Sequence, residues 1–292
     1  MLKNLVFIAQ LIRAKQWVKN AFIFFPLIFS GNLGSPSLLI KTFLAFLGFC
    51  FTSSGVYVLN DFMDRERDRL HPKKSRRPLA QNKISANAVQ LLILSLLTLG
   101  MGICLVADPM VFLMAIIYLV VHLAYNLAIK NIVILDVIFI ALGFQIRIWA
   151  GSLASNAIPS VWLQLCVFIL ALFLGFNKRR HELETLHEQA SHHRKVLADY
   201  TTYLLDQIVM ICSTLAIVFY GLYTISSDIV SRLGNHNMVY SVIFVIYGMF
   251  RYLYLVHVKK AGDDPGELLF TDKSLIINIV LWIIFVIIIL YR

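Results

Sequence analysis

Nine apolar stretches, separated by shorter polar segments, make up most of the chain. Most of them approach the roughly 20 residues that an α-helix needs to cross about 30 Å of hydrocarbon. The first contains Pro26, which predicts a kink there. The pattern predicts an all-α, polytopic membrane protein with about nine transmembrane helices. The stretches lie at about 20–35, 38–59, 88–106, 109–127, 132–152, 160–177, 205–225, 237–257 and 274–291.

Three longer polar segments interrupt this pattern, at about 60–87, 178–204 and 258–273. None of them is long enough to form a soluble domain of its own. We therefore predict a single transmembrane domain over residues 1–292, with the polar site in these three loops.

Composition agrees with a membrane protein. The chain is 59% hydrophobic and 14% charged, whereas soluble domains average about 45–50% apolar and about 25% charged residues. All four cysteines lie inside apolar stretches, which indicates buried apolar side chains rather than disulfides or a zinc site.

The basic residues predict the orientation. If the N-terminus is cytoplasmic, most of the 26 lysines and arginines fall in cytoplasmic segments, where positive residues collect. The net charge of +10 is then a signal of topology. We expect contact with bilayer lipids and no nucleic-acid partner.

The strongest candidate for chemistry is N-D-F-M-D-R-E-R-D at 60–68, at the predicted cytoplasmic end of the second span. If the helix continues, Asp61, Asp64 and Asp68 lie on one face beside Asn60. Three carboxylates at this spacing repel one another and need a cation. Their hard oxygen atoms suit Mg²⁺, which usually binds one or two carboxylates together with substrate phosphates. A solvated helix end with local arginine partners is the alternative.

A basic segment, H-P-K-K-S-R-R-P at 71–78, follows the aspartates. Lys73, Arg76 and Arg77 could contact anionic lipid head groups. They could also bind phosphate groups opposite a metal held by the carboxylates. Arg76 and Arg77 directly precede Pro78, which stiffens the turn and favours the second interpretation.

A second cluster, G-F-N-K-R-R-H-E-L at 175–183, ends the sixth predicted span. Lys178 and Glu182 are four residues apart and could pair. A Lys-Arg-Arg run at a helix end is often only a stop-transfer signal. Acidic residues in the same turn and on the same predicted membrane side favour a functional role for Lys178 and Arg179.

Some polar residues fall inside or at the ends of predicted spans. Asp136 and Arg147 lie in the fifth span, where a charge facing lipid costs at least about 2.5–3.5 kcal/mol. They could pair with other helices or line a polar cavity. Tyr125 and Lys130 lie at the end of the fourth span.

The N-D-x-x-D-x-x-x-D pattern resembles the first aspartate-rich motif of the UbiA superfamily of intramembrane prenyltransferases. The predicted number of spans and the polar cytoplasmic loops also resemble that superfamily. R-A-K-Q-W-V-K-N at 13–20, G-F-N-K-R-R-H-E-L and L-D-V-I at 135–138 resemble the decaprenyl-phosphate phosphoribosyltransferase branch of that superfamily. Ala14 stands where that branch usually has proline. The second aspartate-rich motif of the aromatic prenyltransferases is absent, and Lys178–Arg180 stands in its place.

This resemblance implies Mg²⁺-dependent transfer of 5-phosphoribose from phosphoribosyl pyrophosphate to a polyprenyl phosphate, in the cytoplasmic membrane of a bacterium, with the site facing the cytoplasm. Transfer of a polyprenyl group to an aromatic acceptor is the alternative, and a transporter is a weaker one; a homo-oligomer is left open. The expected metal ligands are Asp61, Asp64 and Asp68, and the expected catalytic residues are these three with Lys178 and Arg179. The expected substrate-binding residues are Lys15, Lys19, Asn20, Asn60, Lys73, Arg76, Arg77, Tyr125, Lys130, Asp136, Arg147 and Glu182.

Overall fold

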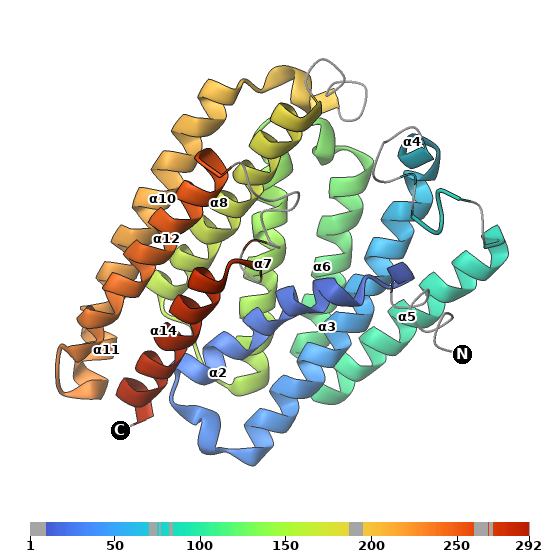
Figure 1. Cartoon of the computed structure of the whole chain (residues 1–292). Coiled ribbons are helices and arrows are strands. Elements are labelled where there is room, and N and C mark those ends of the chain that lie inside the picture. The colour runs from blue at the N-terminus through green and yellow to red at the C-terminus, as the bar shows by residue number, and fades with distance from the viewer. Residues whose placement is uncertain are drawn as a thin grey trace. The chain divides into compact units, whose positions relative to one another are not determined.

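The computed structural model describes residues 10–69, 75, 77–81, 84–186, 195–259, 268 and 271–291 (Figure 1). Two residues of the predicted site, Lys73 and Arg76, lie outside these ranges, as does most of the predicted loop at 258–273.

All regular elements among the described residues are helices, and eight helical segments are long and apolar enough to cross a membrane. One of these segments, Asn237–His257, combines a short 3₁₀-helix with the α-helix that follows it. The eight segments correspond, within a few residues at most ends, to eight of the nine predicted spans. The chain is therefore an α-helical integral membrane protein. The long helices are α3 (Pro36–Met63), α5 (Ala86–Ala107), α6 (Pro109–Leu127), α7 (Leu135–Ser155), α8 (Val161–Leu186), α10 (Thr202–Thr224), α12 (Val242–His257) and α14 (Lys273–Tyr291).

Shorter helices connect or precede them. They are η1 (Ala14–Phe24), α2 (Phe25–Phe29), η2 (Asn32–Gly34), α4 (Arg65–Arg69), η4 (Ile129–Asn131), η6 (Lys195–Asp199), α11 (Ser227–Leu233) and η7 (Asn237–Ser241).

The predicted first span, 20–35, is not one of the eight long helices. Pro26 stands at the start of α2, and the chain before it forms the 3₁₀-helix η1. Because proline has no backbone N–H, it favours a new helical start at this point. The count of nine spans and the cytoplasmic N-terminus stay predictions.

The segment η1 nevertheless follows α3 over a long distance, in the opposite direction. Arg13 binds Asp61, the Trp17 indole donates to Ser54 Oγ at 2.9 Å, and the Phe24 and Phe46 rings lie 5.4 Å apart. The N-terminal segment therefore brings Arg13 to the end of α3 that carries the aspartates.

The chain divides into two compact units. Unit 1 comprises Met1–Ile132 and Ile146–Ile158, and unit 2 comprises Val133–Gln145 and Pro159–Arg292. The helix α7 therefore contributes its first half to unit 2 and its second half to unit 1. The single domain predicted from the sequence stays a prediction.

Close backbone contacts hold unit 1 together. A Cβ atom on Gly100 of α5 would lie 2.6 Å from the Thr52 backbone nitrogen of α3. One on Gly151 of α7 would lie 2.0 Å from the Ile23 carbonyl oxygen of η1. Small residues at such crossings let helices approach closely, which is how van der Waals packing stabilises helices in a membrane.

In unit 2, α8, α10, α12 and α14 pack in sequence around a core that includes Phe173, Leu205, Tyr252 and Leu275. The outward faces of the outer helices carry exposed leucine and isoleucine side chains, as expected for surfaces that face lipid tails.

Candidate active site

The aspartate-rich segment lies where α3 ends. The last turn of α3 closes when the Asp64 backbone N–H donates to the Asn60 carbonyl oxygen at 2.9 Å. Asp64 itself leaves the α-helical conformation, with φ −92° and ψ 3°, and the five-residue helix α4 follows. Asp61 and Asp68 therefore lie on either side of a break rather than on one continuous helix.

Asp61 is almost fully buried and has two basic partners. The Arg13 guanidinium donates to both of its oxygens, with Nε 3.0 Å from Oδ2. Arg77 Nη1 donates to Oδ1 at 2.7 Å. Arg13 also lies over the Tyr57 ring, 5.3 Å from its centroid. Its own backbone is left-handed, with φ 52°, an uncommon conformation for a residue other than glycine.

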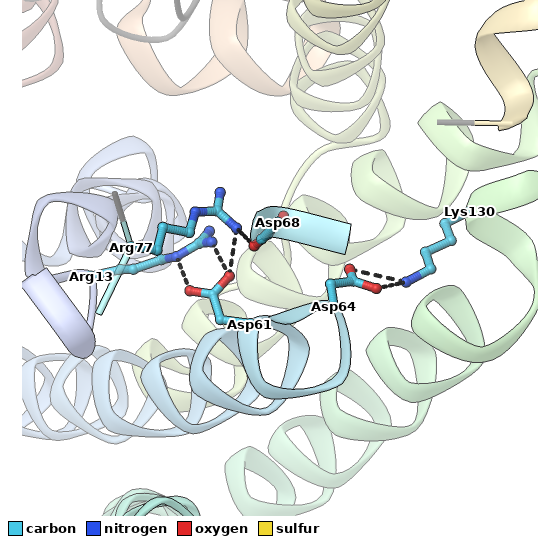
Figure 2. A network of polar contacts seen from close by, with 6 residues as sticks. All are labelled: Arg13, Asp61, Asp64, Asp68, Arg77 and Lys130. Atoms are coloured by element: carbon cyan, nitrogen blue, oxygen red, sulfur yellow. Dashed lines mark hydrogen bonds and ion pairs between the residues drawn. The ribbon is translucent and has the colours of Figure 1, made fainter. Parts of the chain in front are cut away.

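Asp68 and Asp64 turn to different partners, as Figure 2 shows. The same Nη1 atom of Arg77 donates to Asp68 Oδ2 at 2.7 Å, so Arg77 bridges Asp61 and Asp68. Lys130 Nζ lies 2.8 and 3.1 Å from the two oxygens of Asp64. The prediction that all three carboxylates share one face is wrong for Asp64. The break in the helix turns this side chain away. Lys130 offsets the charge of Asp64, whereas Asp61 and Asp68 share Arg77.

The donor set fits a hard divalent cation. Asp61 and Asp68 converge on a single nitrogen, which shows that their oxygens can share one cation. Asn60 Oδ1 is buried and has no hydrogen-bond partner within the described part of the chain, and an amide oxygen is another hard ligand. Among the described residues, no group of three or more acidic, histidine or cysteine side chains is arranged to hold a metal ion. Two carboxylates are enough for Mg²⁺ when substrate phosphates complete its coordination.

Two predicted substrate-binding residues, Asn20 and Arg147, form a buried polar network in unit 1. Arg147 Nε donates to Asn20 Oδ1 at 2.7 Å, and its Nη2 donates to the Tyr118 hydroxyl at 3.0 Å. The Asn20 amide in turn donates to Ser53 Oγ at 3.2 Å. The network ties η1, α3, α6 and α7 together, which is one of the two roles the sequence left open for Arg147.

The other predicted residues of unit 1 differ in exposure. Lys15 is exposed, whereas Lys19 and Tyr125 are half-buried. Their binding roles stay predictions.

The second predicted cluster lies in unit 2, and its two arginines form ion pairs with carboxylates of the same unit. Arg179 is 1% exposed, and its Nε donates to Asp136 Oδ2 at 2.6 Å. Its Nη1 donates to Glu182 at 2.8 Å. Arg180 is likewise buried, between Glu184 and Asp206. Of the Lys-Arg-Arg run, only Lys178 is more than slightly exposed.

Tyr200 completes the surroundings of Asp136. Its hydroxyl donates to Asp136 Oδ1 at 2.8 Å and accepts the Ile134 backbone N–H at 2.7 Å. Burial, and then the negative charge of Asp136, raise the pKa of the Tyr200 hydroxyl, so it stays protonated as a donor. Ile134 has φ 68°, which is strained for a β-branched residue. Asp136 and Tyr200 therefore hold a strained turn at the start of α7.

Sequence reasoning missed Arg13 and Tyr200. Arg13 is not among the residues that the sequence predicts for the site, although it begins the R-A-K-Q-W-V-K-N motif. A basic residue in a segment predicted to lie on the same side as the aspartates was the available signal. Nothing in the sequence separates Tyr200 from the other tyrosines.

Fold and site together define a helical membrane protein with a polar site of carboxylates and cations at one end of a membrane helix. The sequence model of the UbiA prenyltransferase family matches residues 21–271. The chain belongs to this family and is a transferase.

Two similar proteins align with nearly the whole chain. The decaprenyl-phosphate phosphoribosyltransferase of Mycolicibacterium smegmatis is 30% identical, over 96% of this chain and 92% of that protein. The enzyme of the same name from Corynebacterium glutamicum is 28% identical, over 96% of this chain and 85% of its own. A UbiA homologue from Archaeoglobus fulgidus, solved with GPP and Mg²⁺, has a TM-score of 0.74 at 18% identity over 97% of this chain and 99% of its own.

Proposed function

We propose that the protein transfers 5-phosphoribose from phosphoribosyl pyrophosphate to a polyprenyl phosphate and releases pyrophosphate, at the cytoplasmic face of a bacterial membrane. The observation behind this proposal is the presence of basic side chains beside the aspartates. Arg13, Arg77 and Lys130 lie within ion-pair distance of its three carboxylates. A site that receives two phosphorylated substrates needs both carboxylates for a metal and cations for phosphate oxygens. The names of the similar proteins support this choice of substrates.

The reaction would form a bond between an oxygen of the lipid phosphate and C1 of the ribose. The C1–oxygen bond to the diphosphate breaks, and its electron pair leaves with pyrophosphate. The lipid phosphate is already anionic, so the nucleophile needs no general base. A Mg²⁺ ion held by Asp61 and Asp68, with Asn60 beside them, would supply positive charge to the leaving diphosphate.

The protein's own residues would bind and orient the two substrates. Arg13, Arg77 and Lys130 would exchange carboxylate partners for phosphate oxygens, and guanidinium groups bind such oxygens in a bidentate way. Lys15, Lys19, Lys73 and Arg76 are proposed for the 5-phosphate and the lipid phosphate. Lys178, which is half-buried while Arg179 and Arg180 are buried, is proposed as a further phosphate contact.

The test is incubation of membranes containing the protein with labelled phosphoribosyl pyrophosphate and polyprenyl phosphate. We expect label in the organic phase and release of pyrophosphate, and neither with the Asp61→Asn variant. A parallel incubation contains polyprenyl diphosphate and 4-hydroxybenzoate. Prenylated aromatic product there, without a lipid-linked pentose phosphate in the first incubation, would replace this proposal with the aromatic prenyltransferase alternative.

A further inference from the structure

Arg13 and Arg77 are bonded to the same carboxylate oxygens that a metal ion would use. Asp61 Oδ1 accepts from both guanidinium groups, and Arg77 Nη1 stands 2.7 Å from Asp61 and 2.7 Å from Asp68 (Figure 2). Arg77 therefore occupies the position between two carboxylates that a shared metal ion would take.

The carboxylates of the cluster already have cationic partners. Three carboxylates face three cations, and the six side chains in Figure 2 sum to a formal charge of zero. A divalent cation that enters alone must displace Arg77 from between Asp61 and Asp68. It would then lie beside two guanidinium groups that still need partners, and like charges at such distances repel one another.

A diphosphate changes this balance. It brings negative charge, and its oxygens match the planar donor fork of a guanidinium. Arg13 and Arg77 can then move from carboxylate to phosphate oxygens, and the freed carboxylates can bind the metal ion. Arg13 has a left-handed backbone conformation and directly precedes η1. Its side chain therefore reaches the cluster from a segment other than the one that carries the aspartates.

We propose that Arg13 and Arg77 make metal binding conditional on a diphosphate: they act as exchangeable counter-ions that exclude a lone divalent cation and admit it together with the diphosphate. The proposal rests on the proposed function only in requiring that this site takes a diphosphate with a divalent ion. It does not depend on whether the group transferred is a phosphoribosyl or a prenyl group.

The experiment measures binding of Mn²⁺ to the purified full-length protein in detergent, by equilibrium dialysis, with and without inorganic pyrophosphate. We expect the wild type to bind Mn²⁺ at least tenfold more tightly with pyrophosphate. Arg77→Gln should bind Mn²⁺ at least tenfold more tightly than the wild type when pyrophosphate is absent, because the cation that bridges Asp61 and Asp68 is then removed. Arg13→Gln should shift in the same direction.

Two further variants locate and control the effect. Asp61→Asn should abolish the pyrophosphate-dependent binding, which places the Mn²⁺ at this cluster. Arg65→Gln is the matched control, because Arg65 lies in the same segment but bonds the Phe62 carbonyl oxygen and the exposed Glu66. It should behave as the wild type does.

A tightening in either arginine variant that retains the wild-type elution volume and thermal transition supports the proposal. The proposal is overturned if the wild type binds Mn²⁺ equally tightly with and without pyrophosphate, or if neither variant tightens Mn²⁺ binding in its absence. The dialysis contains neither phosphoribosyl pyrophosphate nor a lipid phosphate. Failure of the proposed function in the incorporation assay would therefore leave this result intact, and the converse also holds.

Discussion

Replacing Arg179 with glutamine should destabilise the protein rather than weaken the binding of a substrate. Arg179 is 1% exposed, and Asp136, its partner at 2.6 Å, is fully buried. Removal of the guanidinium takes a buried cation away from the Asp136 carboxylate, while the Tyr200 hydroxyl still donates to it. Breaking one side of a buried ion pair costs about 3–5 kcal/mol. At about 2–4 °C per kcal/mol for domains of 150–250 residues, the unfolding midpoint should fall by about 6–20 °C.

The measurement is thermal unfolding in detergent for Arg179→Gln, Asp136→Asn and the double variant. Because the double variant removes both charges, it should be less destabilised than the sum of the single ones, with a coupling energy of about 0.5–3 kcal/mol. Lys178→Gln is the contrast. The Lys178 side chain is only half-buried, so the unfolding midpoint of this variant should stay close to the wild-type value. Its apparent KM for one phosphorylated substrate should rise about tenfold, which corresponds to about 1.4 kcal/mol. A wild-type midpoint in Arg179→Gln together with a raised KM would refute the structural role of Arg179 and restore it as a phosphate ligand.

Three further predictions follow from single contacts. Asp61→Asn should lower kcat by at least about 10²-fold without loss of membrane insertion, measured as lipid-linked product per unit of inserted protein, because it removes an expected metal ligand. Gly151→Ala should lower the unfolding midpoint, since its Cβ atom would lie 2.0 Å from the Ile23 carbonyl oxygen; an unchanged midpoint would mean that η1 does not pack there. Hydrogen bonds from Arg251 lower the pKa of Asp272 from 3.8, so its stabilising contribution is complete above about pH 4 and is lost as the pH falls through the lowered value. Asp272→Asn should therefore have a midpoint a few degrees below the wild type at pH 7, and the difference should vanish in strong acid; a difference that does not depend on pH would contradict this origin.

The site was partly predictable because its residues cluster along the chain. Asp61, Asp64 and Asp68 follow an apolar stretch within eight residues, and their type alone indicates a cation site. Which way each side chain turns was not predictable, because it depends on where α3 ends. The helix stops at Met63, and this break sends Asp64 to Lys130 while Asp61 and Asp68 share Arg77.

The amino-acid pattern alone was enough to locate the eight long helices among nine predicted spans and to indicate the family. A membrane helix satisfies its own backbone hydrogen bonds within one continuous segment, so local hydropathy is enough to locate it. The partners of the charged residues, by contrast, become visible only when the helices are packed in three dimensions. Arg13 and Asp61 are 48 residues apart, Lys130 and Asp64 are 66 apart, and Arg179 and Asp136 are 43 apart. Such pairs depend on how helices pack and on which side chains lose their water. No local pattern in a single sequence records that information.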